Sequence, residues 1–469
     1  MKARARTALG TLVLVAAASA AVAVALRVEK KGEEEKTRKE TEEKLLSFDR
    51  AKVRELTVEA KGGTVHLVKA GDGWRITAPV EADAERYAVD AILDKLATVR
   101  RRSEVSDAGG LERFGLDHPS VRITAGLEGG GSAILALGET NSFDGSIFAR
   151  VGSGPALVVG SDARWPLEKD LFDLREKRVL TLADQDVARL EVTGPKGQYA
   201  LAREDGHWKA SGPIADRADE ATVNRILGAL RGLRATRFVD APGPDRDYGL
   251  DRPRWTVRLT APGGAVRTLS LGAPPPRKKG EPAEAVLYAR VSGSRALAAV
   301  ANTAAKDLEA DAFALRDKTV LPFDREKVAA VRLESDGNAI EVQKKPAAPD
   351  AGPGDDWALT SPRAAPAQRW KMSSLLSTLS ALRATRFADE SGKSAGERGL
   401  ASPSRTVTLL GADGKSLGRL EVGKEEGDKV YVRSSTGPRI YEVEKARLAD
   451  LPRSADDLEE KPAAPAKGG

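Results

Sequence analysis

The sequence predicts an α+β protein that contains three copies of one module, each an antiparallel sheet with a packed helix. A tryptophan-led strand, a proline and an amphipathic helix follow one another at three places, beginning at Trp74, Trp208 and Trp357. The tryptophans lie 134 and 149 residues apart, and a repeat of this length is a small domain and not a solenoid rung. Helices mixed with short strands and glycine turns indicate the α+β class.

Each predicted helix has apolar residues at i, i+3, i+4, i+7 and i+10, which form one stripe suited to lying on a sheet. The stripes are Val89, Ile92, Leu93, Leu96 and Val99; Val223, Ile226, Leu227, Leu230 and Leu233; and Met372, Leu375, Leu376, Leu379 and Leu382. A large residue that recurs at one register position indicates a core position. We therefore predict that the repeat core includes Trp74, Trp208, Trp357, Leu96, Leu230 and Leu379.

The chain begins with a basic segment, 1–6, followed by an uncharged run of twenty residues, 7–26. About twenty apolar residues suffice to cross a bilayer as a helix, so we predict a transmembrane anchor. A cleaved signal peptide with an Ala18-Ser19-Ala20 site is the alternative. The anchor is favoured because the apolar run continues past this site to Leu26. Residues 27–47 are dense in charge and predict a solvated stalk.

The charges on the two sides of the apolar run bear on the orientation of this anchor. Three basic side chains precede the apolar run and six lie between Arg27 and Lys39, so the positive-inside rule does not favour export. The signal-like start favours an exported body. We expect a single-pass protein of the cytoplasmic membrane with its body in the periplasm or outside.

The predicted order of elements in each module is β-β-β-α-β-β-β-β-α. The first strands lie in 48–60, 182–194 and 323–335, and the second in 64–69, 198–203 and 339–343. A Gly-Leu-x-x-Pro turn follows each helix, at 115–119, 249–253 and 399–403. Similar segments, FDLREKRVL at Phe172 and FALRDKTVL at Phe313, close the first two copies. The third is expected to lack this ending and to stop at Leu451-Pro452. The predicted boundaries are 48–181, 182–321 and 322–455 for the repeats and 456–469 for a disordered tail.

Composition excludes some classes of function. The 469 residues carry 75 Lys and Arg against 69 Asp and Glu, a net charge of +6. This excess is spread along the chain and not gathered into a nucleic-acid-binding patch. Cysteine is absent, so no disulfide supports the fold.

Residues suited to catalytic chemistry are few. His66, His118 and His207 have no metal-ligand spacing, and the Gly-Lys-Ser tripeptides at Gly392 and Gly414 lack the first glycine of a phosphate loop. We predict no catalytic, cofactor-binding or metal-binding residue, and no enzyme activity.

Arginines near the ends of the helices are the candidate contact edge, namely Arg234, Arg237, Arg383 and Arg386. The plainer interpretation is that they offset the helix dipole and stay solvated. The functional interpretation is a basic edge, once per repeat, that meets acidic partners or lipid head groups.

The anchor, the stalk and the units with W-x-(I/L)-x-x-P, a leucine-rich helix and G-L-x-x-P resemble the bacterial domain of unknown function 4340 family. The resemblance covers three copies from about Phe48 to Leu451 and rests on packing motifs. Members of this family resemble accessory proteins of ABC-type transport systems, including those tied to gliding motility. The resemblance implies an extracytoplasmic body on one anchor, and it supplies no catalytic residue.

Three functions follow as expectations. The first is an accessory subunit of an ABC-type transporter, with a membrane permease as partner. The second is a module that binds an envelope polymer such as peptidoglycan or polysaccharide, which should show an aromatic-lined groove. The third is a carboxylate-dependent hydrolase, which should show a deep polar pocket.

Overall fold

The computed structural model describes residues 44–105, 110–212, 215–273, 286–335, 337–346, 356–388 and 394–460. The predicted anchor, 7–26, and most of the predicted stalk lie outside these residues. Within the described ranges, no helix has both the length and the apolar character needed to cross a membrane.

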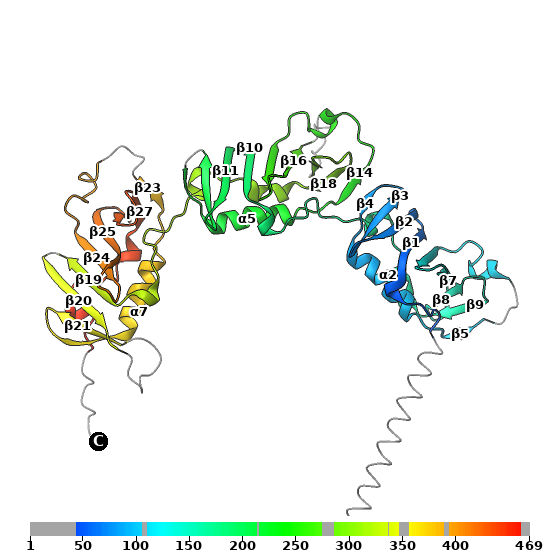
Figure 1. Ribbon diagram of the computed structural model, residues 1–469, viewed down its shortest axis with the longest axis horizontal. Coiled ribbons are helices and arrows are strands. Elements are labelled where there is room, and N and C mark those ends of the chain that lie inside the picture. The colour runs from blue at the N-terminus through cyan, green and yellow to red at the C-terminus, as the bar shows by residue number, and fades with distance from the viewer. Residues whose placement is uncertain are drawn as a thin grey trace, which may run out of the picture. The chain divides into compact units, whose positions relative to one another are not determined.

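Each copy contains one nine-stranded sheet, and all three sheets have the same order of strands (Figure 1). In the first copy the order is β4-β3-β2-β1-β6-β7-β8-β9-β5, and the assigned neighbours pair antiparallel. The elements are β1 Val53–Ala60, β2 Gly63–Ala70, β3 Gly73–Ala78, β4 Ala82–Asp83, α2 Arg86–Thr98, β5 Ser103–Glu104, β6 Val121–Leu127, β7 Ser132–Thr140, β8 Ile147–Val151, β9 Ala156–Val159, α3 Arg164–Leu167 and α4 Leu171–Leu174.

The other two copies repeat this pattern. The second has β10 Arg189–Gly194, β11 Gly197–Glu204, β12 His207–Gly212, β13 Ala215–Arg217, α5 Glu220–Arg231, β14 Arg237–Val239, β15 Trp255–Thr260, β16 Val266–Gly272, β17 Val286–Val291, β18 Leu297–Ala301 and α6 Ala312–Leu315. The third has β19 Ala330–Ser335, β20 Asn338–Lys344, β21 Trp357–Ser361, β22 Ala365–Ala367, α7 Arg369–Ser380, β23 Arg386–Phe387, β24 Arg405–Leu410, β25 Ser416–Glu426, β26 Lys429–Ser434 and β27 Ile440–Glu444.

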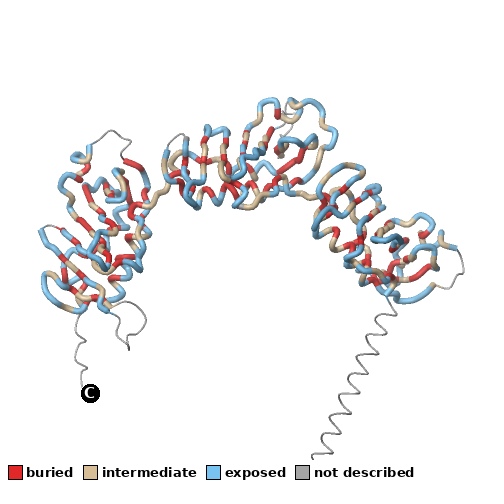
Figure 2. The backbone as a smooth tube through the Cα atoms, viewed as in Figure 1, coloured by how far each residue is buried: buried red, intermediate tan, exposed pale blue. Residues whose placement is uncertain are grey.

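Alternation along the strands decides which face of each sheet is covered. In β1, Leu56 and Val58 are buried, whereas Glu55 and Glu59 on the other face are exposed. The buried face receives the apolar stripe of α2, and the red and pale blue segments of Figure 2 show this division along the chain. One face of the sheet is therefore core and the other is polar surface.

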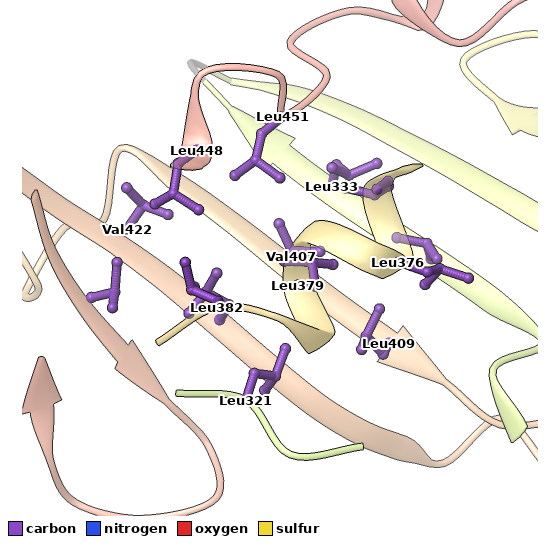
Figure 3. Close-up of a cluster of buried hydrophobic side chains, with 14 of the residues drawn as sticks. Leu321, Leu333, Leu376, Leu379, Leu382, Val407, Leu409, Val422, Leu448 and Leu451 are labelled. Atoms are coloured by element: carbon purple, nitrogen blue, oxygen red, sulfur yellow. The ribbon is translucent and has the colours of Figure 1, made fainter. Parts of the chain in front are cut away.

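The third repeat shows the core in detail. Leu376 and Leu379 of α7 lie over Val407 and Leu409 of β24 (Figure 3). Leu451, where the sequence was expected to end the module, is also buried in this cluster. A Leu→Ala change at such a position leaves a cavity as well as losing transfer free energy.

The Gly-Leu-x-x-Pro turns are held by close approach of two backbone segments. Gly115 has a φ of +64°, in the left-handed region that favours glycine. Gly138 lies in β7, and a Cβ added to it would lie 2.1 Å from the carbonyl oxygen of Phe114. The Phe114 ring meets Phe148 at 4.7 Å between centroids. The corresponding pair in the second copy, Tyr248 and Tyr288, lies at 4.9 Å.

The predicted antiparallel sheets and packed helices are present, although strands dominate each module and the chain is mostly β. The predicted order missed two short strands, β4 and β5 in the first copy, because they are only two residues long. The expectation that the third repeat lacks a closing segment is wrong. The backbone amide of Gln368 donates to the carbonyl oxygen of Leu458. The backbone amides of Glu85 and Asp219 donate in the same way to Leu174 and Leu315. Residues 456–460, assigned to the tail from sequence, thus belong to the third module.

The chain divides into two compact units, and the boundary between them lies inside the second repeat. The first unit is Met1–Thr181, Arg231–Arg252 and Leu271–Asn302, and the second is Leu182–Leu230, Pro253–Ser270 and Thr303–Gly469. The first unit contains the first repeat and part of the second, and the second unit contains the rest of the second repeat and the third.

Candidate functional site

The residues predicted for the repeat core are all buried. Trp74, Trp208 and Trp357 are 9%, 4% and 4% exposed, and Leu96, Leu230 and Leu379 are at most 1% exposed. Each tryptophan is the first or second residue of the strand that pairs with the short edge strand of its sheet. These positions explain the recurrence of the motif through packing.

The histidines do not form a site. All three lie at exposed positions, and the His118 side chain is 96% exposed. Among the described residues, no group of three or more His, Asp or Glu side chains could hold a metal ion. Of the two Gly-Lys-Ser tripeptides, the one at Gly414 lies in the turn between β24 and β25, and the other lies partly outside the described residues.

The four arginines of the candidate contact edge each have a partner within the chain. Arg237 donates to the Tyr288 hydroxyl at 2.7 Å, and Arg386 lies 3.6 Å from Glu442. The other two join successive repeats. Arg234 lies 3.4 Å from Glu85 of the first repeat, and Arg383 of the third repeat donates to Asp219 of the second.

The segment between repeats pairs with the chain that follows the helix of the next repeat. Val179 donates its amide to Leu233 at 2.9 Å, and Ala235 donates to Lys177 at 2.7 Å. The corresponding bonds in the next linker run from Val320 to Leu382 at 3.1 Å and from Ala384 to Lys318 at 2.8 Å. The helix ends are thus docking positions for the linker, which explains why the LRATRF string occurs twice.

Two further arginines, missed in the sequence, sit at the centre of these contacts. Arg175 closes the first repeat, stacks on Phe238 at 3.7 Å and pairs with Asp240 at 2.6 Å. We call this set, with Arg234 and Glu85, the first junction. A guanidinium over an aromatic face and against a carboxylate combines cation–π and charge-assisted hydrogen bonding.

Arg316 has the same role at the end of the second repeat. It stacks on Phe387 at 3.5 Å and pairs with Asp216 at 2.9 Å, and its side chain is 2% exposed. Arg439 also reaches Asp216, at 3.0 Å. We call this set, with Arg383 and Asp219, the second junction. The shared signal in the sequence was the arginine after Phe-x-Leu in both closing segments, together with the phenylalanine of LRATRF.

Asp219 carries charge at the second junction. Its side chain accepts from the amide of Thr222 at 2.9 Å and lies 3.7 Å from Lys318. Burial alone raises the pKa of Asp219, yet the Thr222 amide, Lys318 and Arg383 together hold that pKa below its ordinary value. The carboxylate is therefore ionised where the two repeats meet.

The comparisons with known proteins agree with the repeat structure. The family described as "Domain of unknown function (DUF4340)" matches residues 74–253, 208–350 and 357–464. The three matches begin at the repeated tryptophans and together cover more than half of the chain. No curated protein matches the sequence. The chain belongs to the DUF4340 family, of which it carries three matching regions.

Proposed function

We propose that the chain is a non-enzymatic, membrane-anchored envelope protein that works as an accessory subunit of an ABC-type transport system. One observation carries this proposal: the residues shared by the three copies are packing residues, whereas equivalent surface positions differ. The second residue of the main helix is Tyr87, Ala221 and Trp370 in the three copies, and all three are exposed. Repetition of one fold with different surface residues suits a protein that contacts a large partner at several places.

The absence of cysteine allows a direct test of this proposal. Single-cysteine variants at Tyr87, Ala221 and Trp370 place one thiol at the same helix position of each copy. A thiol-directed cross-linker applied to envelope membranes should recover a membrane permease from at least one variant. His118→Cys, on an exposed turn away from the helix, is the matched control. Recovery of the same proteins from the control and the three variants would contradict a specific helix-face contact.

The membrane topology is part of the same proposal. The apolar run 7–26 supports an anchor and the signal-like start supports an exported body. Reporter fusions at the carboxyl terminus should be active only with a reporter that works outside the cytoplasm. Activity of a cytoplasmic reporter alone would contradict the prediction of an exported body and leave the prediction of an anchor unchanged.

The four arginines of the contact edge can contribute to partner binding only with the part of each side chain that its contacts within the chain leave open. Arg234 and Arg383 are about half exposed, at 52% and 47%. Charge reversal would break in-chain contacts as well, so Arg→Lys variants, which keep the charge and lose the fork geometry, are the better probe.

Polymer binding is the second candidate, and one groove favours it. An open groove of about 910 Å³ on the third repeat is lined by Trp370, Arg369, Asp356, Lys345 and Glu460, among others. Trp370 is 63% exposed. An exposed indole with charged groups around it suits the apolar face and the hydroxyls of a sugar ring. Trp370→Ala should abolish binding to purified envelope glycan, and Tyr87→Ala is the matched control. Equal glycan binding by both variants would remove this candidate.

A further inference from the structure

A basic hollow lies at the carboxyl end of α2 in the first repeat. Its volume is about 470 Å³, and its charged lining comprises Lys95, Arg100, Arg101 and Arg102 with one carboxylate, Asp162. Lys95 donates to Asp162 at 2.7 Å, and this bond holds the pKa of Asp162 below its ordinary value. Arg101 pairs with Glu104 across the solvent-exposed rim. Four cationic side chains line the hollow against the two carboxylates Asp162 and Glu104, so the hollow suits an anionic ligand.

The run of three arginines in this hollow is particular to the first copy. Val99, Leu233 and Leu382 are equivalent buried residues that follow the three helices. After them the first copy continues with Arg100-Arg101-Arg102, whereas the others continue with Arg234-Ala235-Thr236 and Arg383-Ala384-Thr385. Ala235 and Ala384 are each 5% exposed, whereas Arg101 and Arg102 are exposed. Two positions that are small in the later copies are therefore cationic in the first.

The later copies show what this surface does. In the second and third repeats the residue after the equivalent buried leucine meets the preceding repeat, through Arg234 with Glu85 and Arg383 with Asp219. In both cases a carboxylate of the preceding repeat supplies the negative charge. The first repeat presents the same surface, with more positive charge, to whatever precedes it in the chain.

The path of the chain identifies that neighbour. Lys44 forms a β-bridge with Arg100, as Arg178 does with Arg234 and Thr319 with Arg383. Leu45 donates its amide to Val99 at 3.1 Å. The segment that enters the first repeat thus takes the place of an inter-repeat linker. The 17 residues from 27 to 43 separate it from the apolar run, and that length spans at most about 60 Å.

We propose that the basic hollow binds the phosphate head groups of anionic phospholipids in the membrane that holds the chain's own amino-terminal segment. This inference rests on the proposed anchor. Guanidinium groups suit phosphate because their planar donors match its oxygens in pairs. Basic side chains close to an anionic leaflet gain further from its surface potential.

The test uses the full chain with one cysteine at Thr98, an exposed residue of the hollow, labelled with a fluorophore. The chain is reconstituted into vesicles of phosphatidylcholine, alone or mixed with phosphatidylglycerol, that carry a quencher on the lipid head groups. Quenching should be strong only with phosphatidylglycerol. The double variant R101Q/R102Q should weaken the contact about ten- to thirtyfold. R246Q, at a 78% exposed arginine of the second repeat, should leave it unchanged.

Flotation with the vesicles tests the anchor separately from lipid binding by the hollow. Flotation without anionic-specific quenching would overturn lipid binding by the hollow and leave the anchor standing. Failure to float would overturn both. Soluble glycerol phosphate should not displace the contact, and full displacement would make the hollow a site for free anions. The Arg101→Lys and Arg102→Lys variants should keep part of the quenching, because they retain charge, and complete loss in them with an unchanged thermal melt would contradict a charge-based contact.

Discussion

The two junctions are built from the same parts, but their carboxylates come from different places. At the first junction Arg175 stacks on Phe238 and pairs with Asp240, whose side chain is 35% exposed. At the second, Arg316 stacks on Phe387 and pairs with Asp216, which is 17% exposed and also holds Arg439. The position of Asp216 in the first repeat is Ala82, as the strand registers show.

This difference teaches which part of a junction is encoded by the repeat and which by the individual copy. The arginine and the phenylalanine belong to repeated strings, so both junctions have the cation–π contact. The carboxylate comes from the residue after β14 at the first junction and from β13 at the second, so the depth of burial and the number of charges differ. We expect the second junction to be the more sensitive of the two to loss of one charge.

The largest effect should follow from Asp216→Ala. Removal of this carboxylate takes the negative charge away from a guanidinium that is 2% exposed, and breaking a buried pair costs about 3–5 kcal/mol. Hydrogen exchange of residues 316–320 in the full chain measures the local opening free energy. Asp240→Ala, the matched change at the first junction, should cost less than Asp216→Ala, because Asp240 is 35% exposed and solvent screens the pair. Equal losses at both junctions would remove the distinction between them.

The assignment of α5 to the second unit predicts where a core defect spreads. Leu230→Ala should cost about 2–5 kcal/mol, because it leaves a cavity under a helix whose apolar face is buried. In the Leu230→Ala variant, amide hydrogen exchange should become faster in β10–β13 and at the second junction. Leu96→Ala in the first repeat is the control, and its effect should stay in the first unit. A melt of the Leu230→Ala chain identical to that of the parent would disprove the core assignment.

Acid should weaken the second junction through Asp219. The pKa of this carboxyl is below its ordinary value of 3.8 in the folded chain, so its stabilising contribution is present above about pH 3.8 and is lost as the pH falls through the folded pKa. Asp219→Asn keeps the acceptor for the Thr222 amide and removes the charge. The acid dependence of exchange at residues 319–320 should therefore flatten in this variant, while that at residues 178–180 stays the same. An unchanged dependence at both sites would exclude Asp219 as its source.

The smallest effect is expected from adding the missing carboxylate to the first junction. Ala82→Asp places an acid at the position that Asp216 occupies in the second repeat. Because Asp240 already pairs with Arg175, the added charge should contribute only about 0.2–1 kcal/mol. Exchange near Arg175 should slow slightly. Ala365→Asp, at the same strand position of the third repeat, is the control because Glu459 stands there where the other copies have arginine. Slower exchange at Glu459 as well would point to a general effect on the edge strand.

The sequence by itself determined the repeat, the helix faces and the glycine turns of this protein. These features depend on local rules: an apolar stripe fixes the buried face of α5, and Gly138 is required because the carbonyl of Phe114 lies where its Cβ would be. The family resemblance rests on the same packing residues, and the matches at three regions confirm it.

Only the tertiary structure decided the junctions, the closing segment of the third copy and the basic hollow. Arg175 and Asp240 lie 65 residues apart in the chain, and no local pattern pairs them. The third closing segment could not be predicted because Glu459 replaces the arginine, although Leu458 keeps the buried position. Arg101 stands where the later copies have Ala235 and Ala384. The role of a side chain at one position of a repeat is apparent only when the neighbour of that position in each copy is known.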